Sequence, residues 1–156
     1  MPIKILAVGT KMPDWVTESY TEYAKRLPRE YAFSLIEIPA QKRGSGSDTA
    51  SILKKEAQAI MAHIEPSSLL IALDVKGQNW STEQLAKKLQ SWHDESHSII
   101  FLIGGPEGLP AVCLERANFK WSLSNLTYPH PLVRVILSEQ LYRAWTIIQN
   151  HPYHRA

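Results

Sequence analysis

Short apolar runs and amphipathic segments alternate along this chain. Four of the five runs stop at or just before a Gly, Pro or Asp and are rich in Ile, Leu and Phe, which is typical of strands. They predict strands at 3–9, 33–38, 69–74, 98–103 and 120–123. The segments between them predict helices at 15–26, 48–64, 81–92, 110–118 and from 131 onward, with a turn at 75–80.

Three of these helices have start signals. Asp48 is a suitable N-cap, and Ser81 followed by Gln84 forms a capping-box pattern. Pro131 fits the first turn of the last helix, where its missing N–H is not needed. We therefore expect the helices to begin near these residues.

The last helix is apolar on more than one side. One helical face carries Leu137, Leu141, Trp145 and Ile148. Leu132, Val133 and Ile136 widen that face. Such a helix must be covered on several sides, either by its own core or by a second subunit.

The alternation predicts an α/β fold with a mostly parallel sheet flanked by helices. The runs at 69–74 and 98–103 are apolar throughout, as in strands that are covered on both faces. The sequence shows no linker or internal repeat, so we expect a single domain spanning residues 1–156.

Composition narrows the class of protein further. The 156 residues carry a net charge of only +2 and one cysteine, which argues against a polybasic RNA-coating protein and against a disulfide framework. No apolar run is long enough to cross a membrane, and no signal-peptide pattern is present. We expect a cytoplasmic protein. Basic residues gather at 42–43 and after Glu139, as either a local basic surface or solvated segments.

Ligands bind at the carboxyl ends of strands in open parallel sheets. Three loops lie there: the one after Asp74, residues 104–108, and residues 122–130. Gly104 and Gly105 would let a ligand approach the backbone closely, although glycines are also common in ordinary turns.

Several familiar chemistries are missing from the sequence. It contains no dinucleotide or phosphate-loop motif, no serine nucleophile elbow and no convincing metal ligand set, and we expect no metal. Cys113 is expected to pack as a small hydrophobe. Apolar walls and backbone groups suit a cofactor with its own reactivity, such as S-adenosylmethionine. Leu73, Ile103 and Leu126 would be its walls, and the 122–128 turn would read its adenine.

Several segments together resemble the RlmH family, SPOUT-class methyltransferases of large-subunit ribosomal RNA. They are VGTKMP at 8–13, IEIP at 36–39, KRG at 42–44, IGGPEG at 103–108, SLSNLT at 122–127, and HPYHR at 151–155. His130 and the helix containing Arg134 and EQLYRA at 139–144 also match. Each segment alone is weak, but their order and spacing over nearly the whole chain are specific.

The resemblance implies a parallel α/β sheet with a C-terminal trefoil knot, a homodimer, and S-adenosylmethionine as cofactor. The implied reaction is methyl transfer to N3 of a pseudouridine in a 23S rRNA stem-loop of the assembled ribosome. The implied cofactor site comprises Leu73, Gly104, Gly105, Leu123, Ser124, Asn125, Leu126, Thr127 and Tyr128. Tyr128 departs from the Leu or Phe of relatives, so its hydroxyl needs a partner if its ring forms a wall.

Removal of the N3 proton calls for a base or a cation that stabilises the anionic ring. The candidates are His130, Tyr153, His154 and Arg155; the alternatives are a histidine held in a Pro-flanked turn and a disordered terminus. Lys42, Arg43 and Arg134 are the candidate phosphate contacts. Rival functions are a SPOUT enzyme acting on tRNA, a non-catalytic ribosome-associated RNA-binding module, and a small-molecule α/β enzyme.

Overall fold

The computed structural model describes residues 1–41 and 48–154. These residues form a five-stranded parallel sheet with the strand order β2-β1-β4-β3-β5. Its strands are β1 (Ile3–Val8), β2 (Ser34–Ile38), β3 (Leu69–Asn79), β4 (Ile99–Ile103) and β5 (Phe119–Ser122). The predicted α/β class and parallel sheet are confirmed.

The helices follow the predicted segments to within a few residues. They are α1 (Asp14–Ala24), η1 (Arg29–Tyr31), α2 (Thr49–Met61), α3 (Thr82–Asp94), α4 (Ala111–Arg116), α5 (His130–Ile148) and η2 (Pro152–His154). Asp48 caps α2 by accepting a hydrogen bond from the Ala50 amide. Ser81 and Gln84 form the predicted capping box of α3.

Strand β3 is longer than the sequence indicates. Residues 75–80 were expected to form a turn, but β3 continues to Asn79, so that prediction is wrong. Trp121 of β5 is opposite both Leu73 and Gln78, so β3 bulges between these two residues. The polar residues of this half look like a turn in the sequence, yet pairing with the edge strand β5 extends the ladder through them.

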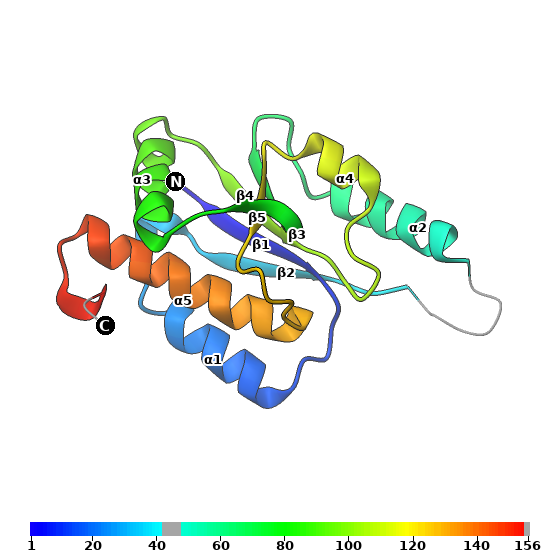
Figure 1. Cartoon of the computed structure of the whole chain (residues 1–156), viewed down its shortest axis with the longest axis horizontal. Coiled ribbons are helices and arrows are strands. Elements are labelled where there is room, and N and C mark those ends of the chain that lie inside the picture. The colour runs from blue at the N-terminus through cyan, green and yellow to red at the C-terminus, as the bar shows by residue number, and fades with distance from the viewer. Residues whose placement is uncertain (42–47, 155–156) are drawn as a thin grey trace.

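The helices form one layer on each face of the sheet (Figure 1). Helices α1, α3 and α5 pack together over the first face, and α2 and α4 cover the second. Side chains alternate between the two cores, so that Ile5 and Phe101 face the first and Leu6 and Leu102 the second. Each such fully buried side chain contributes roughly 1.5–3 kcal/mol.

Helix α5 is buried along most of its length. Leu137, Leu141 and Ala144 are fully buried, and Trp145 and Ile148 pack against the same core, which confirms the predicted face. Leu132, Val135 and Ile136 are half-buried and lie outside both core clusters. No helix of the described residues is long and apolar enough to cross a membrane.

Candidate functional site: a pocket at the carboxyl ends of the strands

A cavity of about 480 Å³ opens beside the bulge of β3 and at the carboxyl ends of β4 and β5. Its volume is within the usual range for small-molecule and cofactor sites. It is lined by Leu73, Asp74, Val75, Ile103, Gly104, Gly105, Pro106, Gly108, Leu109, Leu114, Trp121, Ser122, Leu123, Ser124, Leu126, Thr127, Tyr128, Pro129, His130 and Val133. The three loops that the sequence analysis singled out thus meet in one pocket.

Gly104 allows the chain to turn tightly where β4 enters the pocket. A Cβ on Gly104 would lie 2.8 Å from the Gly108 carbonyl carbon and 2.9 Å from its oxygen, closer than real side chains approach. The turn is closed by a hydrogen bond of 2.9 Å from the Gly108 amide to the Gly105 carbonyl. Gly108 has a φ of +78°, in the left-handed region that favours glycine. The 104–108 turn therefore presents backbone close to the cavity.

The segment from Ser122 to Tyr128 forms the opposite wall through local hydrogen bonds. Ser122 Oγ donates to the Ser124 carbonyl at 2.8 Å, and the Leu126 amide donates to Ser124 Oγ at 3.0 Å. These contacts fix the shape of the turn. The Leu126 side chain is 68% exposed at the pocket rim. Asn125 is exposed and, within the described part of the chain, lies outside the pocket lining.

His130 begins α5 at the floor of the pocket. The N-cap residue Pro129 provides no side-chain cap, but its carbonyl accepts hydrogen bonds from the Leu132 and Val133 amides at 3.0 and 3.2 Å. Pro131 occupies the first turn, as predicted. A Cβ on Gly9 would lie 3.4 Å from Cε1 of His130, so the β1–α1 loop lies close to this ring.

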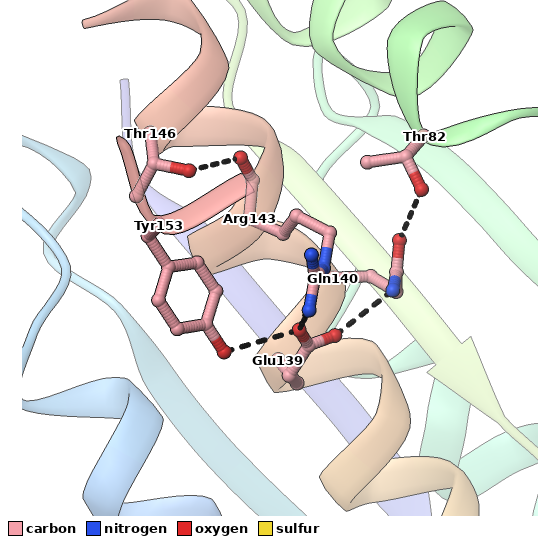
Figure 2. Close-up of polar contacts among 6 residues, drawn as sticks. All are labelled: Thr82, Glu139, Gln140, Arg143, Thr146 and Tyr153. Atoms are coloured by element: carbon pink, nitrogen blue, oxygen red, sulfur yellow. Dashed lines mark hydrogen bonds and ion pairs between the residues drawn. The ribbon is translucent and has the colours of Figure 1, made fainter. Parts of the chain in front are cut away.

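The C-terminal tail lies at the other end of α5 (Figure 1). Tyr153 Oη donates a hydrogen bond to Glu139 Oε1 at 3.2 Å, and its ring meets Tyr142 edge-on at 4.6 Å. The same Glu139 carboxylate accepts a hydrogen bond of 2.8 Å from Arg143 Nε (Figure 2). Burial, and then the negative charge of Glu139, raise the pKa of Tyr153 to about 12. The phenol is therefore neutral at physiological pH and acts as a donor.

The tail and the pocket of one chain are far apart. The 19 residues of α5 span about 28 Å at 1.5 Å per residue. His130 lies at the pocket end, while Tyr153 and His154 form η2 at the far end. The single chain therefore does not bring the predicted catalytic residues together. Arg155 lies outside the described residues.

Comparison with known proteins assigns the chain to a family. A family model described as "Predicted SPOUT methyltransferase" matches residues 1–154. The chain belongs to the SPOUT methyltransferases. It is 50% identical over 155 residues to "Ribosomal RNA large subunit methyltransferase H" of Marinomonas sp. (strain MWYL1), covering 99% of this chain and 100% of that protein.

A solved structure supports the fold of this SPOUT methyltransferase. It is that of a probable methylase family protein from Haemophilus influenzae Rd KW20, which superposes with a TM-score of 0.60 at 12% identity. The match covers 97% of this chain and 69% of that one. At this identity the likeness concerns the fold alone.

The pocket of the methyltransferase contains nearly all of the predicted cofactor residues. Asn125 is the exception, and Tyr128 is half-buried at the wall. The lining residues outside the three candidate loops and the predicted walls are Leu109, Leu114, Trp121 and Val133, and these the sequence analysis missed. Val133 had a usable signal, because it is one helical turn after His130.

The prediction that Arg134 contacts phosphate is wrong for this structure. Its side chain is only 2% exposed and is paired with Glu37 of β2, so its charge is already compensated inside the protein. Lys42 and Arg43, the other candidate phosphate contacts, lie outside the described residues. No group of three or more His, Cys, Asp or Glu residues suited to a metal occurs within 1–41 and 48–154.

Proposed function

We propose that this protein transfers a methyl group from S-adenosylmethionine to N3 of a pseudouridine in a 23S rRNA stem-loop of the assembled ribosome. The proposal is supported by membership of the SPOUT methyltransferases and by 50% identity, over essentially the whole length of both chains, to a ribosomal RNA large subunit methyltransferase H. Such a substrate would place the activity in the cytoplasm.

The pocket fits the proposed cofactor. Gly104 lets the 104–108 turn close tightly, because a side chain there would collide with Gly108, and this turn lines the cavity at the end of β4. Leu73, Ile103 and Leu126 provide apolar walls on three sides, and the 122–128 turn supplies backbone groups for an adenine edge. The cofactor would supply a sulfonium methyl that is already electrophilic, so the protein mainly binds, orients and excludes water.

We propose His130 and the tail residues Tyr153, His154 and Arg155 as the groups that act on the pyrimidine. His130 lines the pocket and can accept the N3 proton or hold a polar edge of the base. Once released from Glu139, the neutral Tyr153 phenol can donate its hydrogen bond to the base, and the cationic Arg155 stabilises negative charge on the ring. Because η2 lies at the far end of its own α5, the tail would act at the pocket of a partner subunit.

A homodimer would cover apolar surface that the single chain leaves open. Val75 and Leu126 on the pocket rim are 64% and 68% exposed. Leu132, Val135 and Ile136 on α5 are half-buried outside both cores. A partner over this region would complete the pocket and bury these side chains. Family membership also leads us to propose a trefoil knot in the C-terminal part and phosphate contacts by Lys42 and Arg43.

The test is methyl transfer with radiolabelled S-adenosylmethionine to ribosomes, to protein-free 23S rRNA and to bulk tRNA. We expect label in the large ribosomal subunit and little in tRNA. Label in tRNA alone would indicate a SPOUT enzyme with another substrate. Ribosome binding without label in any fraction would indicate a non-catalytic RNA-binding module, and label without any dependence on RNA would indicate a small-molecule enzyme.

A further inference from the structure

Arg134 is the largest fully buried side chain of the described residues. Its Nη1 donates to Glu37 Oε2 at 2.6 Å, and its Nη2 donates to the Gly9 carbonyl at 2.9 Å. The guanidinium thereby joins three segments that are distant in sequence: β2, the β1–α1 loop and α5. Burying a charge costs several kcal/mol unless its partners are well placed, so these contacts fix the geometry around them.

We call the contacts of Arg134 with Glu37 and Gly9 the clamp. The segments that it joins meet near His130. Arg134 is one helical turn after His130, so the two side chains lie on the same side of α5. A Cβ on Gly9 would be 3.4 Å from His130 Cε1 and 3.7 Å from Arg134 Nη2, so both groups lie close to Gly9. Gly9 itself is held by its amide, which donates to the Ile38 carbonyl at 2.7 Å. The clamp thus holds this piece of backbone close to the imidazole.

We infer that Glu37 and Arg134 are positioning residues, which hold Gly9 against His130 and so set the orientation of this imidazole in the pocket. Neither residue belongs to the pocket lining within the described chain; they act through the Gly9 carbonyl and the first turn of α5. The inference rests on the proposed function, because it gives the orientation of His130 a role in methyl transfer.

Glu37→Gln is the most informative change. It keeps the size of the side chain and one acceptor but removes the charge that balances the guanidinium. Glu37 is 37% exposed, so the variant is expected to fold. We expect kcat for ribosome methylation to fall about tenfold, while KM for ribosomes and the Kd of S-adenosylmethionine change less than about twofold. Arg134→Lys keeps the charge but loses the planar guanidinium that reaches both partners, so it should have the same effects.

A double-mutant cycle separates positioning from a general structural role. If the clamp acts through His130, Glu37→Gln should have no further effect on kcat in a His130→Ala background. Glu22→Gln is the matched control, because it removes the same charge from a carboxylate that pairs on the surface of α1. An equal loss in both backgrounds, or an unchanged kcat in Glu37→Gln, would overturn the inference.

A second readout does not depend on activity. The Cε1–H resonance of His130 can be assigned by its disappearance in His130→Ala and followed by NMR. We expect it to shift or broaden in Glu37→Gln and Arg134→Lys but not in Glu22→Gln, with the His63 and His97 resonances unchanged. If wild-type protein transferred no methyl group, the proposed function would fail, yet this spectrum would still decide whether the clamp holds the ring. An unmoved His130 resonance in both variants would overturn the clamp.

Discussion

Gly104 determines the shape of the 104–108 turn that lines the pocket at the end of β4. A methyl group at this position would collide with the Gly108 carbonyl group and force the 104–108 turn to shift. Such overpacking costs about 1–3 kcal/mol. We expect Gly104→Ala to weaken S-adenosylmethionine binding about tenfold or more by isothermal titration. Val112→Ala, on an exposed position of α4, is the control, and equal affinities in the two variants would show that the cofactor does not use this turn.

Cys113 is fully buried, and its burial raises the pKa of the thiol to about 11. At pH 8 only about one thiol in a thousand is a thiolate, which is the reactive form. We expect the native protein to react with iodoacetamide at least about a hundredfold more slowly than the urea-unfolded protein, with the rate rising as the pH approaches 11. Since this is the single cysteine, mass spectrometry reads the site directly. Equal rates in the folded and unfolded states would contradict the burial.

Individual pocket residues were predictable where a strand end reveals them. Gly104 and Leu73 follow from the apolar runs that precede the loops, together with the family resemblance. The burial of Arg134 was not predictable, because the sequence does not show whether a charged helix residue will be buried beside a carboxylate. Glu37 is 97 residues away in the chain, and only the sheet brings the two together.

Among the elements, the second half of β3 depends most on one residue. A Cβ on Gly77 would lie 2.6 Å from the Lys120 carbonyl group and 2.7 Å from the Trp121 amide nitrogen, so only glycine lets β3 pass β5 here. We expect Gly77→Ala to lower the free energy of unfolding by more than about 2 kcal/mol in urea denaturation. Gln78→Ala, at the next position, should change it by less than about 0.5 kcal/mol. Similar midpoints for the two variants would mean that the strands can separate without cost.

Elements with strong local signals were predictable, and those set by pairing were not. The capping box of α3 and the apolar run of β4 are local sequence patterns that are sufficient to predict a helix start and a strand. The polar stretch from Asp74 to Asn79 has no strand period, and it becomes a strand only because β5 lies beside it. Its bulge places Val75 on the pocket rim, which local sequence patterns do not reveal.

For the whole molecule, the proposed homodimer makes a direct prediction. Val135 is half-buried on α5 and belongs to neither core, so a charge there should harm a subunit interface more than the fold. We expect Val135→Glu to convert a dimer into a monomer by light scattering after size-exclusion chromatography, with an unchanged circular dichroism spectrum. Lys87→Glu, exposed on α3, should remain dimeric. A dimeric Val135→Glu protein would remove α5 from the interface.

The separation of tail and pocket is a property of the whole fold. The sequence places His130 and Tyr153 within 23 positions of each other, yet the straight helix between them holds them apart. The contacts of Tyr153 with Glu139 and Tyr142 keep the tail at the far end of α5. One chain therefore offers a pocket without the tail, and the proposed activity depends on how two chains meet.

The measurement that bears most directly on the proposed activity is the chemical identity of the product. Ribosomes lacking the modification are incubated with the protein and S-adenosylmethionine, and 23S rRNA is digested and analysed by mass spectrometry. We predict one additional methyl group on a pseudouridine, located at N3, where it blocks the base-pairing edge and stops reverse transcription. A methyl group on another atom or another nucleotide, or unmodified 23S rRNA after cofactor binding has been verified, would contradict the proposed function.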